Sequence, residues 1–212
     1  MRKIHQFIAL LVLVLVSLVG CNYEPRAGGE ANPVRVAEMQ QTLRDLWVGH
    51  IFWVRHVVSN IATNDSAERD AAEKEVVANT KQIANTMTPF YGEAASEKLY
   101  RLLDGNIGAV QEYSEATVAG NKLRQDAALV HLASNADEIA DFLSHLNPYL
   151  QKDAIRGLIA THGAHHVLQI NQYKTKDYAP LGATWPMMRQ HVYVIADTMT
   201  TALAKQFPYK FS

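Results

Sequence analysis

The chain of 212 residues matches itself at an interval of 56 residues, which predicts three copies of one unit. One row of matching positions is Leu43, Leu46 and His50; Leu99, Leu102 and Asn106; and Ile155, Leu158 and His162. A second row is Asn79, Ile83, Ala84 and Asn85; Asn135, Ile139, Ala140 and Asp141; and His191, Ile195, Ala196 and Asp197. Because a repeated supersecondary unit builds the whole fold, we expect the recurring polar positions to share one structural layer.

The hydrophobic spacing from Val34 onward is helical. Apolar residues recur at steps of three and four, for example between Met39 and Val57, and so lie along one side of a helix. Clusters of Asn, Asp, Gly and Pro interrupt this pattern, and no stretch reads as a strand. The pattern predicts helices over residues 34–63, 66–87, 94–118, 122–145 and 153–173, a longer connection over 174–185, and a sixth helix with Pro186 in its first turn.

The repeat also predicts how these helices are arranged. The two polar positions of each copy are 29 residues apart, with a turn near the midpoint: His50 and Asn79, Asn106 and Asn135, His162 and His191. In an antiparallel hairpin, this separation brings the chain back to about the same height. We therefore expect an all-α fold, an antiparallel bundle of three 56-residue helical hairpins (six helices). A short open superhelix of stacked helix pairs is the alternative.

Further polar side chains fall three or four residues from these positions and so on the same helix faces. The predicted polar layer contains His50, Asn79, Gln82, Asn106, Asn135, Glu138, His162, His165 or His166, and His191. An unsatisfied buried polar group costs about 1–3 kcal/mol, so half a dozen would cancel most of the ~5–15 kcal/mol by which a domain is stable. These groups must therefore bond to one another, hold water or bind a ligand.

The ligand interpretation makes this layer a binding site for one transition metal ion. His162 and His166 are four residues apart, which puts two imidazoles on one helix face, and neutral imidazole suits zinc, copper, nickel or iron. Met187 and Met188 lie within one turn of His191 and offer soft sulfur, which makes copper plausible. The predicted ligands are His50, Glu138 (or an orienting partner), His162, His166 and His191, supported by Asn79, Asn106, Asn135 and His165.

Two other interpretations of the polar layer stay open. In one, the layer is hydrogen-bonded internally and fixes the register of the helices, and the protein is a structural or interaction module. In the other, a bound metal with an open position serves a hydrolytic or redox enzyme. The sequence lacks Glu-x-x-His, Cys-x-x-Cys-His and Gly-x-x-x-x-Gly-Lys, which argues against a di-iron carboxylate bundle, covalent haem and a phosphate-binding loop. Binding is therefore favoured over catalysis.

The first 20 residues have the features of a signal peptide. Arg2 and Lys3 precede an apolar run from Phe7 to Val19, which at about 1.5 Å per residue is too short for a bilayer core of about 30 Å. The run ends in Leu-Val-Gly-Cys, which resembles the lipoprotein box of bacteria. This resemblance implies cleavage before Cys21 and attachment of acyl chains that hold the protein on a membrane. Cys21 is the only cysteine, so no intrachain disulfide forms.

These features divide the chain into a signal peptide at 1–20, a flexible tether at 21–33 and a helical domain at 34–212. A plain cleaved signal with an incidental cysteine is the alternative. Asn22, and not Asp, follows the cysteine, and by resemblance to sorting signals of two-membraned bacteria this indicates the outer membrane, facing the periplasm. The mature chain has 20 − 2 = 18 basic against 21 acidic residues and no basic stripe, which argues against nucleic acid as a partner. A protein partner is not specified.

Five stretches of the chain and its end carry a resemblance to known proteins. They are LRDLWVGHIFWVRHVV at 43–58, PFYGEAASEKLYRLL at 89–103, ASNADEIADFLS at 133–144, RGLIATHGAHH at 156–166, HVYVIAD at 191–197 and the closing QFPYKF. They resemble a family of secreted bacterial all-helical (lipo)proteins of uncharacterised function, and the resemblance covers nearly all of residues 40–211. Its members often carry names such as acetylglutamate kinase or glycosyltransferase, activities for which this chain has no motif. In that family the position of Asn106 is often histidine, so this chain departs at one position of the predicted layer.

Overall fold

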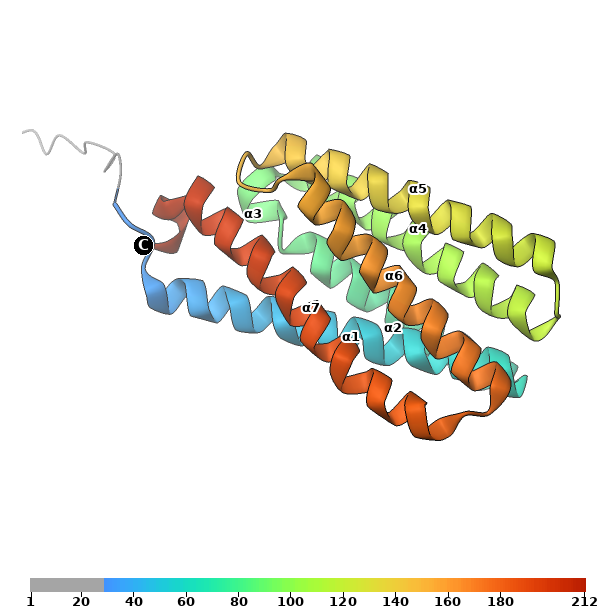
Figure 1. Cartoon of the computed structure of the whole chain (residues 1–212). Coiled ribbons are helices and arrows are strands. Elements are labelled where there is room, and N and C mark those ends of the chain that lie inside the picture. Colours follow the sequence, from blue (N-terminus) through green and yellow to red (C-terminus); the bar gives the residue numbers. More distant parts are fainter. Residues whose placement is uncertain (1–28) are drawn as a thin grey trace, which may run out of the picture.

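The computed structural model describes residues 29–212, and this part of the chain is built of helices and short turns (Figure 1). The six long helices are α1 (Pro33–Thr63), α2 (Ser66–Asn85), α4 (Glu93–Val118), α5 (Lys122–Leu146), α6 (Lys152–Thr175) and α7 (Tyr178–Gln206). Two short ones are α3 (Thr88–Tyr91) and the 3-10 helix η1 (Pro208–Phe211). The all-α class is thereby confirmed. The predicted signal peptide, Cys21 and most of the predicted tether lie outside the described residues.

The long helices form three antiparallel hairpins, α1–α2, α4–α5 and α6–α7, that close into a ring. The first helices of the hairpins, α1, α4 and α6, pack against one another, and α2, α5 and α7 each pack on two of them. Because α7 packs back on α1, the arrangement is a closed bundle and not the open superhelix. The turns after α1, α4 and α6 gather at one end of the bundle, and the C-terminus lies at the other end (Figure 1).

The three turns inside the hairpins share one geometry and lie 56 residues apart. Each contains a residue with left-handed backbone: Asn64 (φ 59°), Gly120 (φ 69°) and Lys176 (φ 56°). The backbone N–H of the following residue then donates to a carbonyl in the last turn of the helix, at 2.9–3.0 Å: Asp65 to Asn60, Asn121 to Ala116, and Asp177 to Gln172. This left-handed cap satisfies carbonyls that the helix end leaves open and reverses the chain within a few residues.

The start of α7 differs from the sequence prediction. The connection expected over 174–185 is replaced by helix from Tyr178, and Pro186 lies inside the helix instead of in its first turn. Two prolines and a glycine in this stretch disfavour helix locally. However, Thr184 is buried, and its hydroxyl donates to Oε1 of Gln172 on α6 at 2.9 Å. Packing against α6 therefore outweighs the weak local propensity.

The core consists of two apolar clusters with buried polar residues at their boundary. On α1, α4 and α6, the first cluster includes Trp47, Leu103 and Ile159, and the second includes Val54, Ile107 and Ile170. His50, Asn106 and His162 lie between these positions along the same three helices and are buried. The polar residues therefore form a layer across the middle of the bundle.

The two ends of the described chain meet at one end of the bundle. The backbone N–H of Asn32 donates to the carbonyl of Phe211 at 2.8 Å, and the Phe211 side chain is buried. α1 begins directly afterwards, at Pro33, with the side chain of Asn32 as its N-cap. Asn32, near the end of the predicted tether, is thus fixed to the C-terminal 3-10 helix, and Pro33, the last tether residue predicted, belongs to α1.

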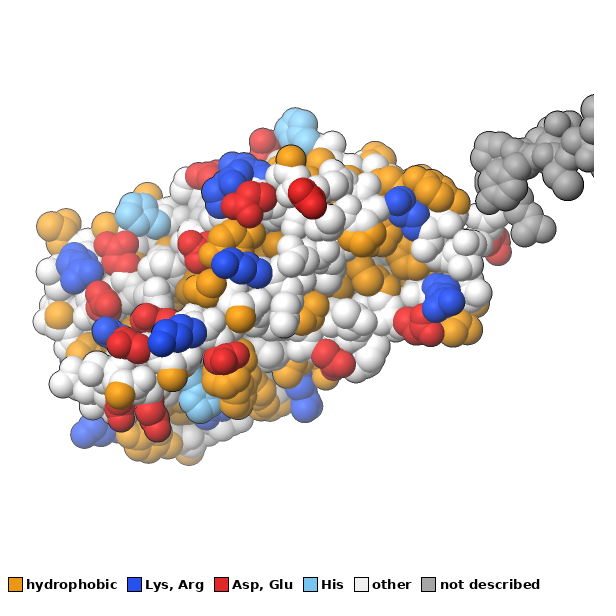
Figure 2. Space-filling view, turned by 180° about the vertical axis from the view of Figure 1, so that it is seen from behind, with side chains coloured by type: hydrophobic (Ala, Val, Ile, Leu, Met, Phe, Trp, Pro, Cys, Tyr) orange, Lys and Arg blue, Asp and Glu red, His pale blue; other side chains and the backbone are white. Residues whose placement is uncertain are grey.

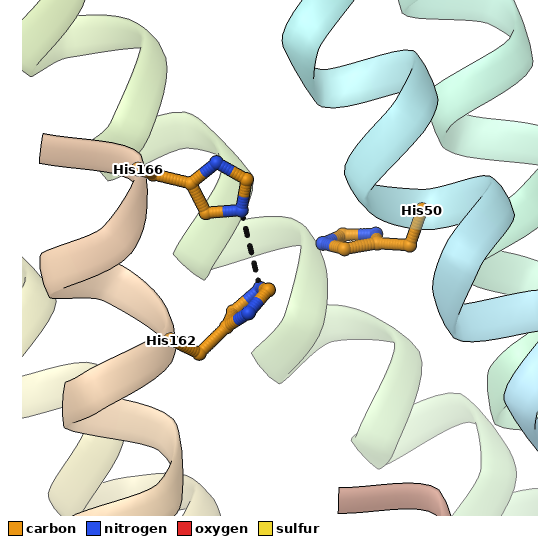
Figure 3. A group of neighbouring side chains, drawn as sticks. All are labelled: His50, His162 and His166. Atoms are coloured by element: carbon orange, nitrogen blue, oxygen red, sulfur yellow. Dashed lines mark hydrogen bonds between the residues drawn. The ribbon is translucent and has the colours of Figure 1, made fainter. Parts of the chain in front are cut away.

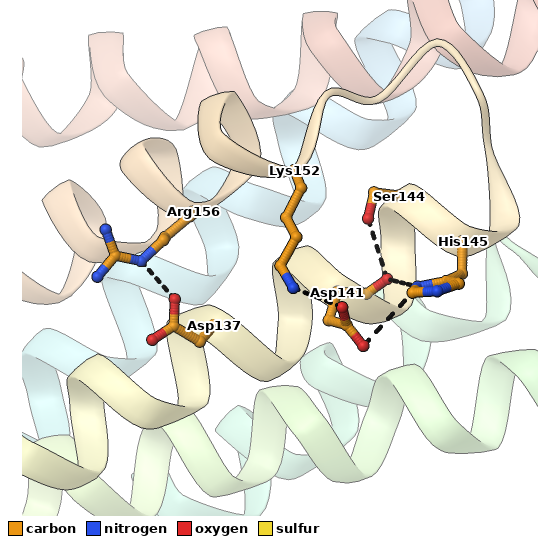
Figure 4. Close-up of polar contacts among 6 residues, drawn as sticks. All are labelled: Asp137, Asp141, Ser144, His145, Lys152 and Arg156. Carbon is orange, nitrogen blue, oxygen red and sulfur yellow. Dashed lines mark hydrogen bonds and ion pairs between the residues drawn. The ribbon is translucent and has the colours of Figure 1, made fainter.

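The surface of the bundle carries ion pairs and charges of both signs. Between α5 and α6, Arg156 pairs with Asp137, and Lys152 Nζ lies 2.6 Å from Asp141 Oδ1 (Figure 4). These side chains are about half exposed, so each pair stabilises the fold only slightly. Acidic and basic side chains are interspersed on the face shown in Figure 2. Within residues 29–212, no helix has the length and hydrophobicity needed to cross a bilayer.

Candidate metal centre

Three buried histidines converge in the polar layer. His50 comes from α1, and His162 and His166 come from consecutive turns of α6. If one ring nitrogen is taken from each histidine, the three nitrogens lie within 4.8 Å of one another. The three rings point toward one another (Figure 3). The Nε2 atoms of His162 and His166 are 3.3 Å apart. This group could hold a metal ion.

Two helices that pack on each other, α1 and α6, position the three histidines. The spacing of four residues puts His162 and His166 on one face of α6, and α6 packs on α1. The Trp47 ring, one turn before His50, packs edge-on against His50 and His162, with centroids 5.4 and 5.7 Å away. Trp47 therefore closes the site toward the first apolar cluster.

The histidine cluster contains polar atoms without a partner. Nδ1 of His50 and Nδ1 of His166 are buried and make no hydrogen bond within the described chain. Buried polar groups are nearly always hydrogen-bonded, and a buried donor or acceptor left alone costs about 1–3 kcal/mol. The polar layer is thus incompletely satisfied at this point. Nδ1 of His166 is not the atom that faces His162, because the contact between these rings is made by the two Nε2 atoms (Figure 3).

Burial keeps the three imidazoles neutral. It lowers the pKa of His50 from 6.5 to about 4, and burial with neighbouring histidines lowers the pKa of His166 to about 3. The pKa of His162 is also well below its ordinary value, chiefly through burial and then through His166 and His50. At neutral pH each ring therefore offers an unprotonated nitrogen, which is the form that binds metals.

The spacing of the nitrogens is close to that of a metal site. Two imidazole nitrogens that bind one ion at about 2.0–2.1 Å lie about 3.3–3.6 Å apart in tetrahedral or trigonal geometry. The Nε2 atoms of His162 and His166, which share a hydrogen bond, already have this separation, at 3.3 Å. A nitrogen of His50 lies within 4.8 Å of a nitrogen of each of these rings.

His191, the other predicted histidine ligand, has a different contact. Its Nε2 lies 2.9 Å from the carbonyl oxygen of Leu158, and its half-buried ring stacks on His162 with centroids 6.5 Å apart. Asn79 and Asn135 occupy the equivalent positions, and their Nδ2 groups donate to the carbonyls of Leu46 and Leu102 at 3.0 and 2.8 Å. These three contacts recur at intervals of 56 residues. His191 therefore joins two helices, and the described metal group does not include it.

Asn106 occupies the position equivalent to His50 and His162. It is buried, and its Nδ2 donates to Oδ1 of Asn135 at 2.9 Å. Asn106 and Asn135 thus satisfy each other across the α4–α5 hairpin. In the α4–α5 hairpin the polar layer is therefore held by a hydrogen bond between two asparagines, whereas the other two hairpins contribute the histidine cluster.

Glu138 requires a correction, because it is exposed and lies outside the buried layer. The spacing of three from Asn135 is compatible with one helix face, but Asn135 lies at the edge of the side of α5 that packs on α4, and Glu138 lies beyond that edge. The buried residues of that side are Ala128, Leu132, Ala136, Ile139, Ala140 and Leu143. His165, predicted as support, is half-buried, with its ring 5.0 Å from that of His191 and its Nδ1 without a partner.

Gln169 is a site neighbour that the sequence analysis missed. It is buried one turn beyond His166 on α6, and its Nε2 lies 3.7 Å from the sulfur of Met188 on α7. Of the two methionines considered for copper, Met188 is buried and Met187 is exposed. The spacing of three from His166 was the available signal for Gln169, but the repeat has no polar residue at this position in the first copy, where Val57 stands.

An apolar cavity lies next to the histidine cluster, with Trp47 in its wall. Its volume is about 30 Å³, and its lining includes Leu43, Leu99 and Ile155, which are equivalent positions of the three copies. A cavity of this volume has room for a water-sized molecule, and its wall is almost entirely apolar. None of the three histidines is among its lining residues.

Comparisons with models of protein families, with curated proteins and with solved structures found no match to this chain. The function is therefore inferred from the geometry of the histidine cluster.

Proposed function

We propose that the protein is a membrane-anchored extracytoplasmic lipoprotein that binds one transition metal ion through His50, His162 and His166. The observation that carries the proposal is the convergence of three buried imidazoles from two helices, with nitrogens within 4.8 Å of one another. An ion at the centre would bind one nitrogen of each ring.

Binding of an ion would explain why a stable fold tolerates this histidine cluster. Three imidazoles without full hydrogen bonding lower the stability of the empty protein, whereas an ion that binds only the folded state raises it by mass action. The three-histidine set is also a ligand set found in catalytic zinc sites, where a fourth position is open. Burial of all three rings favours holding an ion over turning over a substrate.

The experiment is elemental analysis of the purified protein after incubation with zinc, copper, nickel or iron and removal of unbound metal. We expect about one ion per chain in the wild type and loss of that ion in His162→Gln, because one of three ligands is gone. His145→Gln is the matched control, since His145 is an exposed surface residue. A wild type that never holds metal above background, or a His162→Gln variant that holds as much, would contradict the proposal.

A structural or interaction module is the second candidate, and specific contacts favour it. Asn79, Asn135 and His191 each bond to a carbonyl of the neighbouring helix, and Asn106 bonds to Asn135. On this alternative the polar layer fixes helix register, and no ion is needed. Thermal unfolding then has the same midpoint with zinc, with copper and with a chelator, whereas the metal proposal expects the midpoint to rise with the bound ion.

The anchoring part of the proposal rests on the sequence alone. Cys21 is the only cysteine of the chain and ends a Leu-Val-Gly-Cys motif after an apolar run. Lipid on Cys21 would hold the bundle at the outer membrane, on its periplasmic side. The tether would join the bundle at Asn32, the N-cap of α1.

A further inference from the structure

We infer that the histidine cluster is selective for monovalent copper, Cu(I), over zinc. This inference rests on the proposed metal-binding function and names the ion. It is argued from charge, from coordination number and from the chemistry of the neighbouring side chains.

The cluster provides no negative charge. Within the described residues, no Asp or Glu joins His50, His162 and His166. The predicted carboxylate, Glu138, is exposed on α5. Burial lowers the pKa of His50, and burial with neighbouring histidines lowers the pKa of His162 and of His166, which Gln169 raises slightly in turn. An ion bound here would therefore keep its full charge.

A full charge in a buried site favours a monovalent ion. The cost of moving an ion from water into a medium of low polarity grows with the square of its charge, so a divalent ion loses about four times as much hydration energy as a monovalent one of equal size. The three rings are 1–3% exposed, which leaves little water to offset this cost. Zinc sites in proteins commonly include thiolates or carboxylates, which reduce the net charge. This site has neither among its described ligands.

The coordination number points the same way. Zinc takes four ligands, and where three histidines bind it the fourth is water or substrate, to which burial of these rings gives little access. A d¹⁰ monovalent ion such as Cu(I) is satisfied by three ligands in a plane. The most obvious fourth ligand, His191, is not part of the group whose nitrogens lie within 4.8 Å of one another. A soft side chain, the buried thioether of Met188, lies 3.7 Å from Nε2 of Gln169, which is one turn beyond His166. Thioether suits copper in its lower oxidation state and is a poor zinc ligand.

The test compares the affinities of Cu(I) and Zn(II) for the same protein. The full chain with Cys21→Ser, kept in detergent and without oxygen, is titrated with Cu(I) acetonitrile complex against a chromogenic Cu(I) chelator, and with zinc chloride against a zinc chelator. The substitution removes the only thiol, which would compete for Cu(I). We expect one Cu(I) per chain, bound at least roughly 100-fold more tightly than zinc. We also expect Cu(I) binding to be lost in His162→Gln and kept in His145→Gln.

The outcomes separate this inference from the proposed function. Zinc bound at the histidines as tightly as Cu(I), or more tightly, would overturn the copper preference and leave the metal-binding function standing. Absence of binding by both ions would overturn both. Cu(I) bound equally by the wild type and by His162→Gln would place the ion elsewhere and overturn the inference.

A pair of variants tests the charge argument directly. His50→Glu introduces a carboxylate into the ligand set, and His50→Gln is its neutral control of nearly the same shape. We expect the ratio of zinc affinity to Cu(I) affinity to be at least roughly tenfold higher in His50→Glu than in His50→Gln, because the carboxylate compensates the second charge of zinc. An equal ratio in the two variants would overturn the charge argument. The wild-type comparison stands if either variant fails to fold.

Discussion

His50, His162 and His166 illustrate how burial turns a titratable residue into a neutral one. Each ring has lost nearly all contact with solvent, and the pKa values of all three are lowered chiefly for that reason. Outside the protein, a histidine changes charge near pH 6.5. Because the three histidines stay neutral in the folded protein but take up protons when it unfolds, the free energy of unfolding of the metal-free protein depends on pH below about 6.5.

The metal-free protein should lose stability as the pH falls from about 6.5 toward 4. The folded-state pKa of each histidine lies below the unfolded value, so the unfolded chain binds more protons in this range and gains free energy. With pKa values of about 4 for His50 and about 3 for His166, each contributes a slope of up to about 1.4 kcal/mol per pH unit. Urea unfolding of chelator-treated protein at pH 7.5, 6 and 5 measures this slope. His166→Gln should flatten it, and equal stability at pH 7.5 and 5 would refute the expectation.

The sequence predicts the residues of the site only in part, and particular contacts explain the division. His162 and His166 were predictable because a spacing of four fixes two side chains on one helix face. His50 was predictable from the repeat. Glu138 was not excluded, because helical spacing alone does not show which side of α5 faces the core. The contact of His191 with a backbone carbonyl involves another helix and leaves no trace in the spacing.

At the scale of helices, small residues allow the two members of a hairpin to approach each other. A Cβ added at Gly49 of α1 would lie 3.0 Å from Nδ2 of Asn79, the group that donates to the Leu46 carbonyl. At the equivalent Gly105, an added Cβ would lie 3.4 Å from Nδ2 of Asn135. The absent side chain therefore leaves room for a hydrogen bond between helices.

Gly49→Ala should destabilise the protein, although alanine favours helix. The gain in propensity is up to about 1 kcal/mol, but displacing Asn79 costs about 1–3 kcal/mol because a buried hydrogen bond is lost. Gly108→Ala is the control: it is exposed on α4, and its added Cβ meets nothing within 4 Å. We expect urea unfolding to show a stabilised Gly108→Ala and a destabilised Gly49→Ala. If both substitutions stabilise equally, the close approach has no energetic role.

Helix class and most helix ends could be predicted from the sequence, and the start of α7 could not. Periodic apolar residues and left-handed or capping residues near Asn64 and Gly120 mark the turns locally. In the segment around Pro186 the local signals favour a loop, and the helix depends on contacts such as that between Thr184 and Gln172. Such a contact between separate helices is invisible to spacing rules.

At the scale of the whole molecule, the hairpins close into a ring through the packing of α7 on α1. The sequence interval allowed both a closed bundle and an open stack, since each keeps neighbouring copies in contact. The angle at which one hairpin packs on the next decides between the two, and this angle depends on the side-chain volumes at every interface. Closure also brings Asn32 and Phe211 together, so the chain enters and leaves the bundle at one end.

The lipid anchor is the prediction that concerns the molecule as a whole. The eleven residues from Asn22 to Asn32 reach at most about 40 Å, so an acylated Cys21 would keep the entry end of the bundle near the bilayer. We expect the full chain, expressed in a bacterium with radiolabelled palmitate, to incorporate label, and Cys21→Ser to incorporate none. His145→Gln should label like the wild type. Unlabelled wild type, or equal label in Cys21→Ser, would contradict acylation at this residue.

The hydrogen bond between Asn32 and Phe211 holds the two ends of the bundle's chain side by side, so the chain could be joined there and opened at another turn. A short linker from residue 212 to residue 29, with the chain reopened at Gly120, would leave every helix beside its present neighbours. The helices would then follow one another as α5, α6, α7, α1, α2 and α4, and the new ends of the chain would lie at the turn between α4 and α5. A lipid on the new N-terminus would hold the opposite pole of the bundle, where the turns after α1, α4 and α6 gather, near the bilayer.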